Sequence, residues 1–200
     1  MPPHAYRTRT RSRKADATRA RITSAIRDLL AEGAFHQATM EEVARRAGVS
    51  RATLYQHFDS RLDLIDAICE TFAENPALLE LRDLVDDPDA GRALDRTIAN
   101  SVRFWASEDS VLSQIYGVAA IDAAAQSLVD RQRADRRGEL ERLVRNLDRA
   151  GRLQQNGRRA LALLLVLTSY DSFRELRQAG LSARQVSATL QETARELILT

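Results

Sequence analysis

Residues 51 to 56 read Arg-Ala-Thr-Leu-Tyr-Gln, and several of these side chains suit the edges of DNA bases. Arginine can donate two hydrogen bonds to guanine, and glutamine can pair with adenine in the same bidentate way. The methyl groups of Ala52 and Thr53 can contact the methyl group of thymine. A short helix that presented these side chains on one face could therefore read a base sequence.

A helix ahead of this segment would position it. Thr39 stands three residues before Glu42, which is the spacing of a capping box, and this predicts a helix from about Met40. Gly48 suits the left-handed position that ends a helix. The apolar residues expected to face inward are Met40, Val43, Ala44 and Ala47.

A second short helix is expected after the glycine turn. Ser50 can cap its amino end, and Leu54 and Phe58 are four residues apart, so they share a buried side. A helix, a tight turn and a second helix make a helix-turn-helix. The segment could instead be a helical hairpin with solvated polar faces, but the succession of cap, glycine turn, second cap and Tyr-x-His-Phe ending favours a DNA-reading module.

The segment also resembles a known family. The sequence AGVSRATLYQHF spans residues 47–58 and is followed by Asp59, Ser60, Arg61, Leu62 and Leu64, a pattern similar to the TetR/AcrR transcriptional regulators. The resemblance covers the first quarter to third of the chain. It implies an all-α fold, with an N-terminal three-helix DNA-binding domain and a C-terminal helical domain for ligand binding and dimerisation.

The resemblance also implies roles for single residues. Phosphate contacts are expected from Thr39, Ser50, Tyr55 and His57. Base contacts are expected from among Arg51, Ala52, Thr53 and Gln56. Phosphate contacts position a protein on DNA, whereas base contacts choose the sequence. Arg61 stands where the family usually has lysine, and its guanidinium can approach a phosphate with two parallel hydrogen bonds.

The charge is distributed unevenly along the chain. Residues 1–61 hold 12 Lys and Arg against 6 Asp and Glu, a net charge of +6, whereas the remainder carries −4. This asymmetry is expected when one end of a protein meets a polyanion. The basic run from Arg7 to Lys14 predicts a flexible arm over residues 1–14, which either contacts phosphates and the minor groove or remains a solvated tail.

Composition argues against several other classes of protein. No apolar run approaches the roughly 18 to 20 residues of a membrane helix, and no apolar stretch near Pro2 and Pro3 resembles a secretory signal, so a cytoplasmic location is expected. The lone Cys69 suggests simple packing, and the three histidines are too dispersed for a metal site. No spacing of catalytic groups stands out. We therefore expect no enzyme activity, no cofactor and no metal.

The remaining sequence predicts further helices and few other elements. The DNA-binding domain is expected over residues 15–60, and the effector-binding and dimerisation domain over residues 61–200. The helices expected outside the helix-turn-helix span residues 16–32, 61–74, 77–85, 90–106, 109–121, 123–150, 158–179 and 182–199.

Two of these helices suggest a dimer interface. Residues 160–167 are apolar nearly all round, and the final helix begins with a second capping box, Ser182 with Gln185. In the family that the chain resembles, the last two helices pair with their copies. The expected interface residues are Leu164, Leu167, Val186, Leu190, Ala194 and Leu197. Ordinary packing within one subunit is the alternative, whereas a homodimer predicts a palindromic operator.

A mixed aromatic and polar set is the candidate effector pocket. Its residues are Phe104, Trp105, Gln114, Tyr116, Tyr170 and Phe173. Each could instead be core, because large aromatic side chains bury well. The sequence thus predicts a homodimeric, sequence-specific regulator that binds double-stranded DNA, a repressor released by a small apolar effector. The alternative is a nonspecific architectural DNA-binding protein, which would show no operator preference.

Overall fold

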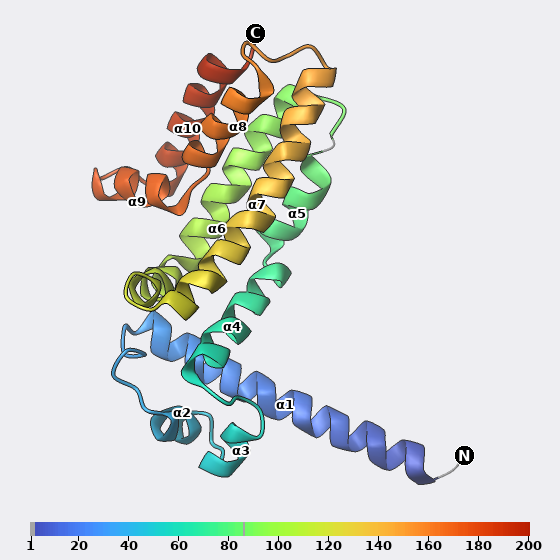
Figure 1. The fold of residues 1–200 in the computed structure, drawn as a ribbon, viewed down its shortest axis with the longest axis vertical. Helices are drawn as coiled ribbons and strands as arrows, with labels where there is room; N and C mark the ends of the chain where they lie inside the picture. The colour runs from blue at the N-terminus through green and yellow to red at the C-terminus, as the bar shows by residue number, and fades with distance from the viewer. Residues whose placement is uncertain (1–2, 86) are drawn as a thin grey trace. The chain divides into compact units, whose positions relative to one another are not determined.

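The protein is helical throughout the part that the structure describes. The computed structural model describes the backbone of residues 3–85 and 87–200 and the side chains of residues 14–85 and 87–200. Figure 1 shows the helices in chain order. They are α1 (Pro3–Ala31), α2 (Met40–Arg46), α3 (Arg51–Tyr55), α4 (Arg61–Thr71), the 3-10 turn η1 (Phe72–Glu74), α5 (Pro76–Leu84), α6 (Ala90–Ala119), α7 (Ala123–Arg149), α8 (Gly157–Leu167), α9 (Tyr170–Gln178) and α10 (Ala183–Ile198).

The chain forms two compact units. The first comprises Met1–Thr71 with Ser110–Leu128, and the second comprises Phe72–Asp109 with Val129–Thr200. Among the described residues no β-strand occurs, and the one isolated β-bridge joins Leu153 to Leu199. No described helix combines the length and the apolar character needed to cross a membrane.

The core of the first unit forms where the apolar pattern predicted it. Helix α1 packs on α2 and α4, and α2 packs on α3. The residues buried between these helices include Ile22, Ile26, Leu29, Leu30, Phe35, Val43, Leu54 and Phe58. Their burial fixes the orientation of the short helices, because apolar side chains removed from water are the main favourable term in folding.

Helix α1 begins earlier than its apolar stripe. The sequence predicted a start near Asp16, whereas the backbone is helical from Pro3. Residues 3–13 have no apolar stripe of the kind that identified the rest of the helix, so periodicity could not find them. The predicted basic arm falls on these residues. Apart from Lys14, which is exposed, the side chains of this arm lie outside the described part of the chain, and its contacts with DNA stay a prediction.

Helix α6 is continuous where two helices were expected. The polar stretch around residues 107–110 suggested a break, but it contains neither glycine nor proline. The Ser107 hydroxyl donates to the Phe104 carbonyl within the helix, at 2.9 Å. Hydroxyls that bond back to the preceding turn can be accommodated inside a helix, which is why the polar stretch does not end it.

The opposite error occurs at residues 168–169, where one long helix was expected and α8 and α9 are separate. The Thr168 hydroxyl donates to the Leu164 carbonyl, and the side chain of Ser169 caps α9 by accepting from the Ser172 amide. The carbonyl of Thr168 accepts from Trp105 Nε1 at 3.0 Å and from Arg136 Nη1 at 2.6 Å. These side-chain donors replace the amide that a continuous helix would have supplied.

The last helix is capped at its start and bonded to an earlier segment of the chain at its end. Ser182 and Gln185 form the predicted reciprocal capping box. At the other end, the amide of Gln154 donates to the Ile198 carbonyl, and the amide of Thr200 donates to the Arg152 carbonyl. Helix α10 packs on α8 through its buried stripe, which contains Val186, Leu190, Ala194 and Ile198.

Candidate nucleic-acid interface

Helix α2 begins at the predicted cap. The hydroxyl oxygen of Thr39 accepts a hydrogen bond from the amide of Glu42 at 3.2 Å. The reciprocal half of the predicted capping box does not form, because the Glu42 carboxylate instead accepts from Arg45 and Arg46. Charge-assisted bonds to two guanidinium groups are stronger than one bond to a backbone amide, which explains the difference.

The turn between α2 and α3 needs its glycine. Gly48 has φ of +63°, and its amide donates to the Arg45 carbonyl at 3.2 Å. The next amide, that of Val49, donates to the Ala44 carbonyl at 3.0 Å. This glycine closes the last turn of α2 and directs the chain toward Ser50 at the start of α3.

Replacing Gly48 by alanine should lower the free energy of unfolding by about 1–2 kcal/mol, because an L side chain is strained in the left-handed region. A Cβ atom there would lie 3.9 Å from Arg21 Nη1, an ordinary contact, so the loss should come from backbone strain. Gly138→Ala is the matched control. That glycine lies inside helix α7 with no atom within 4 Å of the added Cβ, so alanine should stabilise by about 0.5–1 kcal/mol. Urea unfolding of both variants measures the two changes in the free energy of unfolding. Changes of the same sign would contradict backbone strain at Gly48.

Helix α3 is capped as expected and presents an outward face. The Ser50 hydroxyl oxygen accepts from the Thr53 amide at 3.0 Å, and the hydroxyls of the two residues are bonded at 2.8 Å. Leu54 and Phe58 are buried, as the sequence predicted. The exposed side chains of this segment are Arg51, Ala52, Tyr55 and Gln56, and Thr53 is half-buried beside them. The residues expected to contact bases thus lie together on one short helix and its C-cap, Gln56.

Most of the residues expected at phosphates keep accessible surface. Thr39, Ser50 and Tyr55 are exposed, and His57 is half-exposed. His57 lies against Phe58, with ring centroids 6.5 Å apart. Their contacts with DNA stay predictions.

Arg61 has partners that the sequence did not predict. Its Nη1 donates to the carbonyl of Ala38, its Nη2 donates to the carbonyl of Phe35 at 2.6 Å, and its guanidinium carbon lies 4.5 Å from the centroid of the Phe35 ring. Burial lowers the pKa of this guanidinium from its usual value. Arg61 therefore holds the loop that joins α1 to α2, and its expected phosphate contact stays a prediction. A single arginine in the sequence does not indicate which backbone carbonyls its guanidinium will bond, so these partners could not be predicted.

An ion-pair network joins the end of α1 to α2. Arg46 lies 2.7 Å from Glu32 and 3.3 Å from Glu42, and Arg45 lies 2.7 Å from Glu42. Hydrogen bonds from Arg46 lower the pKa of Glu32, and hydrogen bonds from Arg45, followed by Arg46, lower the pKa of Glu42. Both carboxyls have an ordinary pKa of 4.5, so the network stabilises the folded state above that pH and ceases to do so as the pH falls below it.

The wild-type protein should therefore be more stable than Glu42→Gln at pH 7, and this difference should be lost progressively as the pH falls below 4.5. The effect should be small and should weaken with salt, because these carboxylates are exposed. Thermal unfolding of both proteins across the pH range measures it. A difference in melting temperature that stayed constant with pH would show that the ion pairs are not its source.

Four of the six candidate effector-pocket residues lie together in the second unit. Ring centroids are 4.8 Å apart between Phe104 and Trp105, 5.5 Å between Trp105 and Tyr170, and 6.2 Å between Tyr170 and Phe173. All four are buried, and the Tyr170 hydroxyl donates to the carboxylate of Asp109 at 2.6 Å. The remaining two, Gln114 and Tyr116, belong to the first unit. An effector site at this aromatic cluster stays a prediction.

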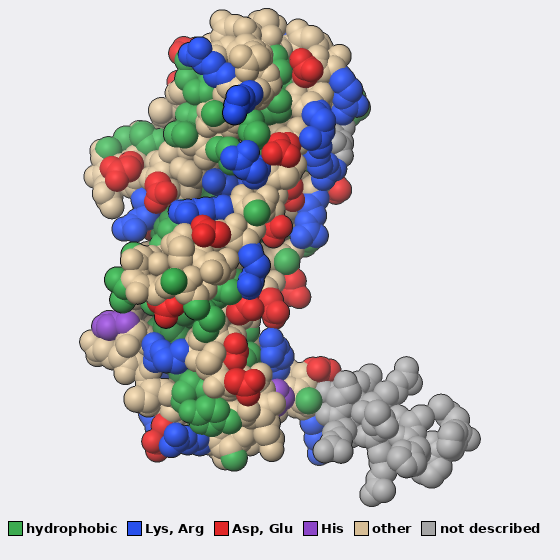
Figure 2. Space-filling view, viewed as in Figure 1, with side chains coloured by type: hydrophobic (Ala, Val, Ile, Leu, Met, Phe, Trp, Pro, Cys, Tyr) green, Lys and Arg blue, Asp and Glu red, His purple; other side chains and the backbone are tan. Residues whose placement is uncertain are grey.

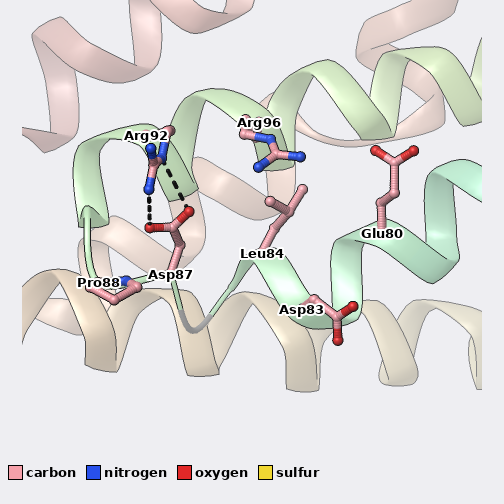
Figure 3. Close-up of a pocket in the computed structure, with 7 residues that line it drawn as sticks. All are labelled: Glu80, Asp83, Leu84, Asp87, Pro88, Arg92 and Arg96. Carbon is pink, nitrogen blue, oxygen red and sulfur yellow. Dashed lines mark hydrogen bonds and ion pairs between the residues drawn. The ribbon is translucent and has the colours of Figure 1, made fainter.

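A surface pocket of about 400 Å³ lies elsewhere in the second unit, at the connection from α5 to α6. Figure 3 shows Arg92 and Asp87 paired beside Pro88 at one end of it, and their nitrogen and oxygen are 2.8 Å apart. Its lining is mostly charged and comprises Glu80, Asp83, Leu84, Asp87, Pro88, Arg92 and Arg96. The segment between the helices expected over residues 77–85 and 90–106 gave no sign of a pocket, because an acidic loop is typical of an ordinary connection between helices.

Arginine and carboxylate side chains are interspersed over the visible surface of the second unit (Figure 2). On α7, for example, Arg133 lies 3.4 Å from Asp130, and Arg137 lies 3.7 Å from Glu141. This helix therefore has a solvated face of mixed charge. Among the described side chains no three His, Cys, Asp or Glu residues converge as metal ligands would.

The expected dimer residues divide into two groups. Leu164, Val186, Leu190 and Ala194 are buried within one copy of the chain, between α8 and α10. Leu167 is half-exposed and Leu197 is 39% exposed. Val166, which the sequence analysis did not single out, is 62% exposed. Apolar surface thus remains on both helices, although their main stripe serves the packing of the protomer.

Comparison with known proteins agrees with the helix-turn-helix. Residues 22–68 match the family model described as "Bacterial regulatory proteins, tetR family". Over 60 residues the chain is 38% identical to the transcriptional activator FasR of Mycolicibacterium smegmatis, a match that covers 30% of this chain and 27% of that protein. Over 55 residues it is 42% identical to the transcriptional regulator UidR of Escherichia coli strain K12, with 28% of each covered. The chain thus spans about a quarter of the length of these relatives.

Solved structures extend the likeness to nearly the whole chain. The structure of a complex of SmeT with triclosan has a TM-score of 0.72 to this protein, at 17% sequence identity, and the match covers 92% of both chains. At this identity the likeness shows the fold. Residues 22–68 are thus similar to the tetR family of bacterial regulatory proteins, and the chain as a whole shares the fold of the SmeT structure.

Proposed function

We propose that this protein is a homodimeric transcriptional repressor, acting in the cytoplasm, that binds a palindromic DNA operator and is released from it by a small apolar effector. The observation that carries the proposal is the exposed face of α3, where Arg51, Ala52, Tyr55 and Gln56 are accessible beside Thr53. These side chains match the hydrogen-bonding and methyl groups of the major groove. Buried Leu54 and Phe58 orient that face outward.

A homodimer supplies the affinity that one short helix lacks. A twofold molecule presents two equal recognition helices to two half-sites, about one helical turn of DNA apart. The exposed apolar side chains Val166 on α8 and Leu197 on α10 support an interface on those helices. The area available to a second copy includes the half-exposed leucines of α8, at positions 161, 163, 165 and 167.

Repression is the direct consequence of such binding. A dimer that covers a palindrome excludes other proteins from the same stretch of DNA, and no additional contact with the transcription machinery is needed. FasR is a transcriptional activator, so a protein with a similar DNA-binding module can also activate transcription. A reporter gene placed behind the selected operator distinguishes the two, since a repressor lowers expression and an activator raises it.

Release by an effector follows from linkage. A ligand that prefers a conformation with the recognition helices at a different separation must weaken operator binding by its differential affinity for the two states. The chain passes between the two units at residues 71–72, 109–110 and 128–129, so α6 and α7 each contribute to both units. The triclosan complex of SmeT and the aromatic cluster around Trp105 and Tyr170 support an apolar ligand.

Comparative titration tests the proposed function. The protein is titrated with an operator selected from random duplexes and with a scrambled duplex of the same composition, over a range of salt concentrations. We expect the operator to bind at least about 10³-fold more tightly, with both affinities falling steeply as salt rises. Equal affinity for the two duplexes at moderate salt would replace this proposal with the nonspecific architectural role.

A further inference from the structure

The arginines of the DNA-binding module are not equally available to DNA. Seven of them lie between residues 14 and 61. Six donate hydrogen bonds to acceptors within the protein: Arg19, Arg21, Arg27, Arg45, Arg46 and Arg61. Arg51 is the exception, because no acceptor among the described residues receives a hydrogen bond from it.

The guanidinium of Arg51 lies instead over an aromatic ring. Its central carbon is 5.6 Å from the centroid of the Tyr55 ring, one helical turn further along α3. Tyr55 is 39% exposed, and Arg51 is exposed as well. Both groups therefore lie on the accessible side of the helix, four residues apart, where helix geometry makes side chains neighbours.

A ring face supports a guanidinium in a way that a carboxylate does not. The attraction acts on the flat face of the cation, so its in-plane N–H groups remain available. Guanine offers two acceptors, O6 and N7, at a separation that matches two of those N–H groups. An arginine held on a ring with all its donors available is thus prepared for guanine, whereas each of the six others already directs at least one N–H group to an acceptor within the protein.

We propose that the Tyr55 ring orients Arg51 for two hydrogen bonds to a guanine in each half-site, so that Tyr55 sets guanine selectivity in addition to any phosphate contact of its hydroxyl. This inference rests on the proposed function and specifies guanine as the base that the α3 face recognises. Tyr55 acts as a positioning residue through Arg51. At an exposed site a cation–ring contact changes the population of the productive rotamer by about two- to fivefold.

Atomic substitution in the DNA tests the role of Arg51. Each guanine of the selected operator is replaced in turn by 7-deazaguanine, which lacks the N7 acceptor and keeps O6. We expect one position in each half-site where this change weakens binding of the wild-type protein by about three- to tenfold. Arg51→Ala should bind the two duplexes equally, and Arg51→Lys, which keeps the charge without the planar fork, should show a reduced ratio.

A matched pair of variants tests the ring. Tyr55→Phe and Tyr55→Leu both lose the hydroxyl, so both should lose its contribution to affinity, which is the same for every duplex. Only phenylalanine keeps a ring under Arg51. The ratio of affinities for guanine and 7-deazaguanine should stay at the wild-type value in Tyr55→Phe and fall toward one in Tyr55→Leu. Circular dichroism confirms that each variant is folded, which is expected because the side chain is partly exposed.

Three results would overturn the inference. If Tyr55→Leu keeps the ratio of Tyr55→Phe, the ring does not position Arg51. If Arg51→Ala keeps the wild-type ratio, another residue contacts that guanine. If the protein selects an operator in which no guanine is sensitive to 7-deazaguanine, the inference fails while the proposed function stands. Failure to select any operator would instead overturn the proposed function, and the inference with it.

Discussion

Arg61→Ala should lower the free energy of unfolding by about 2–4 kcal/mol, the largest loss expected from a partly exposed residue of the DNA-binding module. The guanidinium donates to the carbonyls of Ala38 and Phe35 and lies over the Phe35 ring. Alanine would leave both carbonyls without these donors and remove the contact with a buried ring. Because those carbonyls belong to the loop before α2, the loss should also loosen the start of the helix-turn-helix.

Urea unfolding, followed by circular dichroism, measures this effect. The free energy of unfolding of Arg61→Lys should lie between those of wild type and Arg61→Ala, since an ammonium keeps the charge but lacks the rigid fork that reaches two carbonyls. Arg51→Ala is the matched control. It removes an arginine from the same module with no hydrogen-bonded acceptor among the described residues, so its stability should stay within about 0.5 kcal/mol of wild type.

A phosphate role for Arg61 makes a different prediction. If Arg61 served chiefly to contact the DNA backbone, Arg61→Ala would be as stable as Arg51→Ala and would reduce the salt slope of DNA binding by about one. Finding that combination would contradict the positioning role. Both roles predict equal losses for operator and scrambled duplex, so stability is the measurement that separates them.

Val166→Glu should convert the proposed dimer to a monomer and weaken binding to the full palindrome by at least about 100-fold. A carboxylate buried at an apolar interface without a partner is strongly unfavourable. A monomer also loses the effective concentration that couples two half-sites, which is worth about 10² to 10⁴ in affinity. Val166 is 62% exposed in the protomer, so the substitution should leave the protomer folded.

Sedimentation velocity gives the oligomeric state. Titration with full and half operators gives the gain in affinity that comes from binding both half-sites together. The half operator should bind wild type and Val166→Glu equally. Leu79→Glu is the control for adding charge at an exposed apolar position, because Leu79 is 46% exposed on α5, away from the proposed interface helices, and it should change neither measurement. A Val166→Glu protein that remained dimeric and bound the palindrome normally would place the interface elsewhere.

The elements of the DNA-binding module could be predicted because their signals are local. The Thr39 cap, the Gly48 turn and the spacing of Leu54 and Phe58 each depend on residues at most four apart, and all three are confirmed. The reciprocal bond of Glu42 failed because two arginines compete for the same carboxylate. Periodicity and cap residues alone do not report such competition.

Predictions that depended on distant parts of the chain fared less well. The break after Thr168 is supported by donors from Trp105 and Arg136, which are far away in sequence. Arg61 reaches carbonyls more than twenty residues before it. The apolar stripe of α10 was apparent in the sequence, but whether it packs on α8 of the same chain or on a second copy depends on the tertiary arrangement. The structure places that stripe inside the protomer.

The most direct test of the central claim is selection of bound sequences from a pool of random duplexes by the intact protein. We expect a single enriched palindrome, with half-sites whose centres are about one helical turn apart and with a guanine at the same place in each. The pool should yield no such motif with the variant Arg51→Ala/Gln56→Ala, which is expected to keep the fold but removes the two long side chains proposed to contact bases. Enrichment of no sequence, or of a site without twofold symmetry, would contradict the account of a symmetric dimer that reads DNA through α3.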